Sequence, residues 1–163
     1  MARRTFFSFH YRNDVSRAMV VRNSWVTKPD REAAGFTDAA DFEEIQKKGD
    51  AAVHAWIDAQ LKGTSVTVVL IGSETSTRPY VKYELTQSYA CGNGMLGIYI
   101  HQIKDLNGKT SSKGSNQFGE IGKDSAGKPV YFSVNYPCYD WVDDNGYENI
   151  GAWIRAAAEK AGR

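Results

Sequence analysis

The sequence predicts an α/β fold with a doubly wound, parallel sheet of five strands. Short apolar segments rich in β-branched and aromatic residues alternate along the chain with segments of helical periodicity, the pattern of a sheet covered by helices on both faces. The segment 65–72 is apolar almost throughout, as expected of a central strand that is buried on both faces. With 163 residues, the chain is expected to form a single domain over 1–163.

Four elements are expected before that central strand. Residues 5–9 are aromatic and apolar and predict the first strand, and an Asn-Asp pair beyond it can cap a helix that runs to about residue 22. A short second strand is expected near 35–37. Apolar residues at helical spacing over 41–61 predict one long helix, which Gly63 can end.

The second half of the chain continues the alternation. A helix is expected over about 77–90, with a serine or threonine cap and a proline in its first turn, and a fourth strand over 95–100. Residues 102–128 are polar and rich in glycine, and they predict a long loop of the kind that is functional or mobile. Residues 130–134 predict the fifth strand, and 147–161 predict the last helix. This order is typical of a flavodoxin-like sheet with the strand order 2-1-3-4-5.

The composition excludes several classes of protein. The sequence is 42% hydrophobic and 24% charged, which is a globular composition, and its formal net charge is +1. A nucleic-acid polymer or an anionic membrane is therefore not an expected partner. Neither a membrane-spanning run nor the apolar segment of a signal peptide is present, so we expect a cytoplasmic protein. Two cysteines without CxxC spacing and three scattered histidines predict neither a disulfide framework nor a metal site.

The fold class alone predicts where a ligand binds. In a doubly wound sheet the site lies beyond the carboxyl ends of the first and third strands, where the winding reverses. Here these ends are 8–11, Ser-Phe-His-Tyr, and 72–76, Gly-Ser-Glu-Thr-Ser. His10 is expected to touch a ligand in preference to His54, because His10 follows the first strand at the switch point.

Two glycine motifs do not indicate a nucleotide site. Residues 92–97 spell Gly-x-Gly-x-x-Gly, but a helix precedes them and a strand follows, the reverse of the dinucleotide fingerprint. We interpret them as a helix stop followed by a turn. Residues 108–110, Gly-Lys-Thr, resemble the end of a phosphate-binding loop, but Ile103 stands where the first glycine of that loop is required.

Glu84 is the residue whose place on its helix favours a functional role. At about 100° per residue, Val81 and Leu85 mark the buried stripe, and Glu84 lies about 60° from Val81, at the stripe's edge. A half-buried carboxylate is expected there, beside the loop 73–76, with a raised pKa unless a cation offsets the burial. The alternative is an exposed, solvated glutamate.

Two segments resemble known TIR domains. Residues 6–14 resemble their first-strand motif, in which an aromatic-Ser-aromatic strand end is followed by an acidic residue. Residues 70–85 are more specific: a strand, a Gly-Ser-Glu-Thr turn, an arginine, an aromatic residue and then Val-Lys-Tyr-Glu. This pattern is similar to the TIR-like family of bacterial Thoeris anti-phage proteins, the ThsB group. The resemblance extends over most of the chain, and the glycine-rich loop is its least constrained part.

The resemblance implies that a TIR fold consumes NAD⁺ here. The essential glutamate of the family corresponds to Glu84, which is the expected catalytic residue. The residues expected to bind the substrate are Ser8, Phe9, His10, Tyr11, Ser73, Arg78 and Tyr80. Tyr80 is a departure, because many relatives have tryptophan at this point. No metal is expected, and NAD⁺ is the substrate rather than a resident cofactor.

The expected chemistry is cleavage of the nicotinamide–ribose bond through an oxocarbenium-like state, which a carboxylate can stabilise. The resemblance implies an ADP-ribose-derived signalling nucleotide, a cyclic isomer or a histidine conjugate, that activates an effector on a separate chain. Self-association is left open.

Two alternatives to this enzyme remain. In a non-catalytic TIR-type interaction module, Glu84 is only a helix residue. A nucleoside deoxyribosyltransferase-like enzyme also uses a glutamate near this switch point, but it releases a base from a deoxynucleoside. The motifs within 6–14 and 70–85 favour the enzyme that acts on NAD⁺.

Overall fold

The computed structural model describes residues 3–37 and 39–163, and its centre is a parallel sheet of five strands. The strand order is β2-β1-β3-β4-β7 and each neighbouring pair is parallel, which confirms the predicted flavodoxin-like sheet. The bounds are Arg3–Ser8 for β1, Arg31–Ala34 for β2, Val66–Ile71 for β3, Gly94–Tyr99 for β4 and Cys138–Asp140 for β7. The carboxyl ends of β1 and β3 therefore lie side by side at the switch point.

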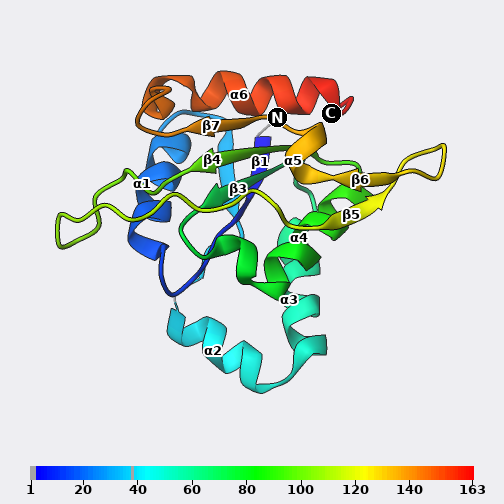
Figure 1. Ribbon diagram of the computed structural model, residues 1–163, viewed down its shortest axis with the longest axis horizontal. Coiled ribbons are helices and arrows are strands. Elements are labelled where there is room, and N and C mark those ends of the chain that lie inside the picture. The colour runs from blue at the N-terminus through cyan, green and yellow to red at the C-terminus, as the bar shows by residue number, and fades with distance from the viewer. Residues whose placement is uncertain (1–2, 38) are drawn as a thin grey trace.

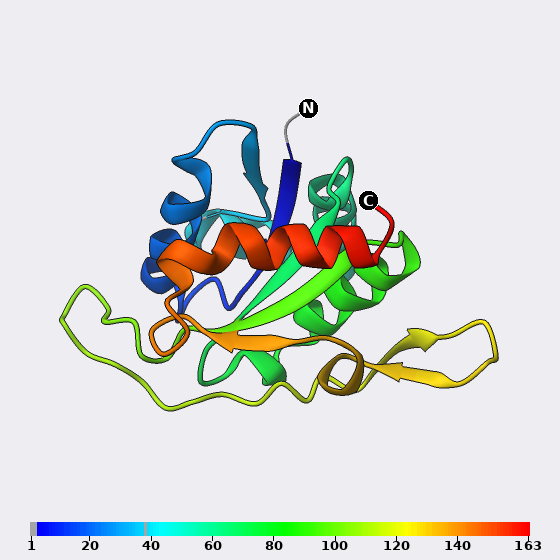
Figure 2. The same ribbon diagram turned by 90° about the horizontal axis from the view of Figure 1, so that it is seen from above.

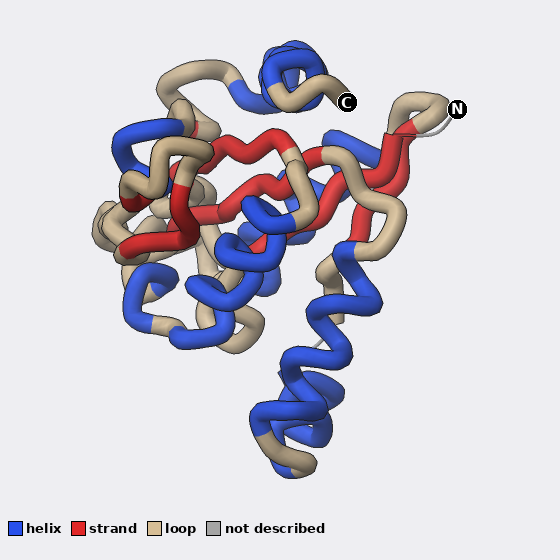
Figure 3. The backbone as a smooth tube through the Cα atoms, turned by 90° about the vertical axis from the view of Figure 1, so that its right-hand side faces the viewer, coloured by secondary structure: helices blue, strands red, loops and turns tan. Residues whose placement is uncertain are grey.

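Helices lie on both sides of the sheet, which Figure 3 shows as one twisted layer. Helix α6 packs on β3 and β4 from one side and α4 packs on them from the other, next to α3 and α2 (Figure 1). Helix α1 contacts β2 and α6. The bounds are Val15–Val26 for α1, Ala39–Lys47 for α2, Asp50–Leu61 for α3, Pro79–Ala90 for α4, Phe132–Asn135 for α5 and Gly146–Lys160 for α6. Within the described ranges, none of these helices is long and apolar enough to cross a membrane.

The elements that frame the switch point follow from their sequences. All six residues of β3 are buried, as its β-branched run predicts. Helix α4 begins at Pro79, whose missing N–H is tolerated in a first turn, and it ends before Gly92, which has a φ of 78°. Val81 and Leu85 are fully buried, so the predicted apolar stripe does face the sheet.

The predicted fifth strand was wrong. Residues 130–134 do not join the central sheet: β6, Pro129–Tyr131, pairs antiparallel with β5, Glu120–Lys123, and α5 follows at once. The sheet edge is taken instead by β7, whose three half-buried residues carry almost no periodic signal. Gly97 allows β7 to approach, because a Cβ at this position would lie only 2.8 Å from the Cys138 sulfur.

The second strand and the second helix also differ from the prediction. Strand β2 ends before the expected 35–37, since Gly35 has a φ of 86° and leaves the extended conformation. The helix expected over 41–61 is divided into α2 and α3 at Gly49, whose φ of 101° is a conformation that glycine adopts without steric cost. Apolar spacing continues across this break, which is why periodicity alone does not reveal it.

Two clusters of buried side chains hold these elements together. The larger cluster joins the sheet to α1, α3 and α6. The smaller one joins β3, β4 and α4 to the segment after β4, part of which was expected to be a loop. Its buried members are Val69, Ile71, Val81, Leu85, Met95, Phe118, Ile121, Val130 and Phe132. The expectation of a loop over all of 102–128 is therefore corrected from residue 118 onward.

Two hairpin turns project at opposite ends of the molecule in Figure 2. They are 105–109 and 124–128, and both have the sequence Asp-x-x-Gly-Lys. In each turn the aspartate Oδ1 accepts hydrogen bonds from the N–H groups two and four residues later, at 2.8–3.0 Å. The two turns are thus locally alike.

Candidate active site

A pocket of about 270 Å³ opens where the fold class predicts the ligand site. It lies between the segment after β1, helix α2 and the start of α4. The residues that line it are His10, Tyr11, Arg12, Phe42, Glu43, Gln46, Arg78 and Tyr80. Four of them were expected to bind the substrate. The contribution of α2 was not foreseen, because nothing in its sequence distinguishes a pocket wall from a solvated helix.

Three aromatic rings in mutual contact form one wall of the pocket. Tyr11 and Tyr80 are nearly parallel, with ring centroids 5.5 Å apart, and Phe42 lies 4.3 Å from Tyr11 and 5.0 Å from Tyr80. Trp56 on α3 supports them with edge contacts to Tyr11 and Phe42. We call Tyr11, Phe42 and Tyr80 the aromatic cover. It joins three separate elements, so its geometry depends on how α2 and α4 are placed.

Glu84 lies behind this cover and is fully buried, not half-buried as expected. Neither carboxyl oxygen has a hydrogen-bond partner among the described residues. Burial raises the pKa of Glu84 well above its ordinary value. The nearby Ser8 hydroxyl offsets this rise in part, although no hydrogen bond of normal geometry joins Ser8 and Glu84. Burial raises the pKa of Tyr11 and of Tyr80, and the charge of Glu84 raises both further, so Glu84 lies near these two pocket residues.

Unpaired polar groups gather around Glu84. The Ser8 hydroxyl and the Tyr11 hydroxyl are both buried, and neither has a hydrogen-bond partner in the part of the chain that the structure describes. Buried polar groups without partners are rare in folded proteins, and each costs about 1–3 kcal/mol. A cluster of them at a switch point is typical of a functional site rather than of a structural core.

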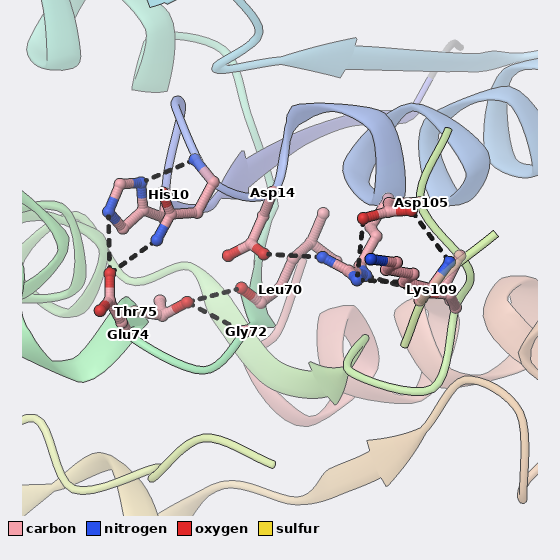
Figure 4. A network of polar contacts seen from close by, with 11 residues as sticks. His10, Asp14, Leu70, Gly72, Glu74, Thr75, Asp105 and Lys109 are labelled. Atoms are coloured by element: carbon pink, nitrogen blue, oxygen red, sulfur yellow. Dashed lines mark hydrogen bonds and ion pairs between the residues drawn. The ribbon is translucent and has the colours of Figure 1, made fainter. Parts of the chain in front are cut away.

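His10 lies at the pocket in a defined orientation (Figure 4). Its Nδ1 accepts a hydrogen bond from the Asn13 N–H at 3.2 Å, so the proton of the neutral ring is on Nε2, which lies 4.0 Å from a Glu74 carboxylate oxygen. Burial and the charge of Arg78 lower the pKa of His10, whereas Glu74 opposes this shift. The imidazole is therefore neutral at pH 7 and can donate from Nε2.

The remaining residues expected at the site lie in three different settings. Arg78 lines the pocket and its Nε is buried without a hydrogen-bond partner in the described ranges. Phe9 packs in the core against Tyr11 and Phe36, and its ring is not part of the pocket wall. Ser73 is exposed and does not line the pocket either. Sequence reasoning thus located the strand ends but not which side chains face inward.

The same region matches a known protein family. The family described as "Thoeris protein ThsB, TIR-like domain" matches residues 6–105, well over half of the chain. The chain belongs to this family. The ThsB TIR-like match extends from within β1 to just beyond the end of β4 and includes Glu84 and every residue that lines the pocket.

A curated relative of this TIR-like chain extends the similarity further. It is a Bacillus cereus (strain MSX-D12) protein named "Putative cyclic ADP-D-ribose synthase ThsB1". The two are 38% identical over an alignment of 191 positions, gaps included, which covers 94% of this chain and 100% of the relative. The alignment therefore continues beyond the TIR-like match into the segment after β4, and the resemblance seen in the sequence is confirmed.

Proposed function

We propose that this protein cleaves NAD⁺ at the nicotinamide–ribose bond and makes a cyclic, ADP-ribose-derived nucleotide, which signals to an effector on a separate chain in anti-phage defence. The observation that carries the proposal is Glu84, a buried carboxyl group with no partner among the described residues, behind a pocket at the switch point. The name of the Bacillus cereus relative supports the class of product. Membership of the Thoeris family supports the setting.

The proposed reaction breaks the bond between the anomeric carbon of the ribose and the ring nitrogen of nicotinamide. Nicotinamide leaves as a neutral base with the bonding electron pair, and the positive charge moves to the ribosyl group, which becomes oxocarbenium-like. A hydroxyl group of the same ADP-ribose attacks the anomeric carbon and loses its proton, which closes a ring. If water attacks instead, the product is ADP-ribose.

Glu84 stabilises the positive charge in this proposal. Because its pKa is raised by burial, the protonated form of the carboxyl group is favoured in the empty site. The nicotinamide ring of NAD⁺ carries a positive charge, and an opposite charge a few ångströms away favours the carboxylate form. Substrate binding therefore releases the proton of Glu84 to solvent and leaves a carboxylate beside the reacting carbon, where it lowers the energy of the oxocarbenium-like state.

The aromatic cover has to open for this chemistry. Glu84 has no exposed surface, and a pocket of about 270 Å³ is below the range of roughly 300–1,000 Å³ typical of small-molecule sites. Displacement of Tyr80 or of Phe42 would join the pocket to Glu84. The faces of the same rings can then stack on the nicotinamide or adenine ring.

The first test is the substitution Glu84→Gln, with NAD⁺ as substrate and mass spectrometry of the products. We expect nicotinamide release to fall below detection, because an amide cannot become negatively charged, while circular dichroism shows an unchanged fold. Glu159→Gln, on the exposed side of α6, is the matched control and should retain wild-type activity. Full activity of Glu84→Gln would contradict the assignment. Cells that express the same variants are also challenged with phage, because activity can depend on an infection signal.

The same assays separate the two alternatives. A deoxyribosyltransferase would release free base from deoxynucleosides and leave NAD⁺ intact. An interaction module would leave both substrates intact and would retain a protein partner in the Glu84→Gln variant. Detection of a cyclic ADP-ribose isomer that disappears with Glu84→Gln excludes both.

A further inference from the structure

A second group of buried charges lies beside the same strand ends, next to the pocket but not in its wall. Asp14 is 1% exposed and Arg17 is 5% exposed. Asp14 immediately precedes α1, and its backbone carbonyl accepts the N–H of Ala18, the first hydrogen bond of that helix. Its side chain makes no capping bond. In Figure 4 it lies between His10, Glu74 and Thr75 on one side and Asp105 and Lys109 on the other.

Asp14 packs directly on the backbone where β3 ends. A Cβ at Gly72 would overlap the Asp14 carboxylate, so this approach requires glycine. The Gly72 N–H donates to the Thr75 hydroxyl oxygen at 2.8 Å, which closes the turn. That turn begins the loop 72–78, which carries Glu74 to His10 and Arg78 to the pocket.

Arg17 links Asp14 to a different loop. Its Nη1 lies 3.8 Å from Asp14 Oδ1, and its Nη2 lies 3.9 Å from Asp105 Oδ2. It donates from Nε to the Ile103 carbonyl at 2.7 Å and from Nη2 to the Lys109 carbonyl at 2.9 Å. One buried guanidinium thus holds both ends of the turn 105–109.

The contacts of Arg17 distinguish the turn 105–109 from the similar turn 124–128. The turns 105–109 and 124–128 share their sequence pattern and their internal hydrogen bonds. Arg17 bonds to the first turn, whereas the hydrogen bonds of the second turn, within the described residues, are internal to its own hairpin. The contacts of Arg17 are therefore not a general requirement of an Asp-x-x-Gly-Lys turn.

We propose that Asp14 and Arg17 are positioning residues, which clamp the loop 72–78 and the turn 105–109 to the carboxyl end of the sheet and so keep His10 and Arg78 in place at the pocket. The clamp itself is a property of the fold. Its effect on NAD⁺ cleavage rests on the proposed function.

The charge of Asp14 is needed for this clamp. Burial raises the pKa of Asp14 to about 6. The charge of Arg17 opposes this shift, and the charge of Glu74 adds to it. The carboxyl group is therefore ionised at pH 7.5 and protonated at pH 5. Ionised Asp14 attracts Arg17, and protonated Asp14 does so only as a neutral hydrogen-bonding group. Asp14→Asn keeps the shape of the side chain and removes this charge.

The first readout is hydrogen exchange of the full chain without substrate. At pH 7.5, Asp14→Asn is expected to speed exchange in 72–78 and in 105–109 by about tenfold or more, as local opening becomes easier. At pH 5 its exchange should match that of the wild type. Arg17→Lys should loosen 105–109, because one ammonium group cannot reproduce the fork of donors. Asp124→Asn is the matched control and should affect only its own turn, 124–128.

The second readout separates positioning from a merely structural role. The pKa of His10, measured by NMR, should rise in Asp14→Asn. Burial and the charge of Arg78 are the two largest causes that lower it, and release of the loop 72–78 weakens both, which outweighs the smaller opposing effect of Glu74 on the same loop. The other charges that face His10, Glu74 and Arg12, act in opposite directions. In the NAD⁺ assay we expect a fall in kcat/KM of about tenfold or more, with Asp124→Asn unchanged.

Two outcomes would overturn the proposal. Unchanged exchange in both segments of Asp14→Asn would show that no clamp exists. Faster exchange with an unchanged His10 pKa would show that the clamp does not position the pocket. If wild-type protein fails to cleave NAD⁺ but the exchange and His10 results are as expected, the proposed function fails and the clamp stands.

Discussion

At the residue scale, Glu84 combines two properties that a folded core does not usually tolerate together. It is ionisable and fully buried, and its oxygens have no hydrogen-bond partner within the described residues. Ser8 and Tyr11, which surround it, also keep unpaired hydroxyl groups. A substrate that carries a positive charge would supply the missing interactions. The site is therefore expected to reduce the stability of the empty protein.

A stability measurement tests this expectation. The pKa of Glu84 is raised in the folded state. Below the pKa of the same side chain in the unfolded chain, about 4.3, Glu84 is protonated in both states and does not reduce the free energy of unfolding. As the pH rises above that value, the free energy of unfolding falls. Glu84→Gln should thus be more stable than the wild type at pH 7, by about 1 kcal/mol or more. Urea unfolding from pH 5 to pH 8 should show this difference growing with pH, whereas Glu159→Gln shows none. A constant difference would mean that Glu84 does not titrate abnormally.

At the scale of elements, the site depends on how two helices approach one segment. Phe42 comes from α2 and Tyr80 from the first turn of α4, and both contact Tyr11 after β1. Arg12 and Glu43 form an ion pair across the same junction. The geometry of the aromatic cover therefore depends on the position of α2 relative to α4, and we expect its rings to keep water from Glu84.

Removal of one ring should open the cover. In Tyr80→Ala, water gains access to Glu84, so the pKa of its carboxyl group should fall toward the ordinary value. Tyr80→Phe keeps the ring and should keep the pKa raised. The measurement is a pH titration of carbon-labelled glutamate by NMR, with Glu84→Gln to assign the signal. A pKa that is equally raised in both variants would show that the cover does not exclude water.

At the scale of the whole molecule, one part of the segment after β4 packs in the protein core and another part projects into solvent. Ile121 is 1% exposed and belongs to the smaller cluster, which supports α4 and thereby Glu84. Leu106, in the same glycine-rich region, is 91% exposed at the tip of the other hairpin. The family match ends at residue 105, so the smaller cluster is completed by residues outside it.

These two apolar residues should respond very differently to substitution by alanine. Ile121→Ala should cost about 2–5 kcal/mol, because it leaves a cavity in a packed cluster. Leu106→Ala should change stability by less than about 0.5 kcal/mol. Chemical denaturation of the two variants is the measurement. Equal effects would mean that the β5–β6 hairpin does not pack on α4 in solution.

The sequence alone predicted a parallel sheet with this order of strands and a switch point beyond the first and third of them, although it misplaced the second and fifth strands. Strand 65–72 and the helix over 77–90 carry strong, local patterns, and the switch point follows from the order of elements alone. Strand β7 and the break at Gly49 could not be predicted, because a short edge strand depends on a partner far away in the chain and one glycine does not disturb apolar spacing.

Only the tertiary structure decided which groups surround the site. The full burial of Glu84, the wall formed by Phe42 and the bonds of Arg17 to the Ile103 and Lys109 carbonyls all depend on contacts between separate elements. Helical periodicity predicts roughly in which direction a side chain points, but not how much protein covers it. The protein that covers a carboxyl group determines its burial and thereby its pKa.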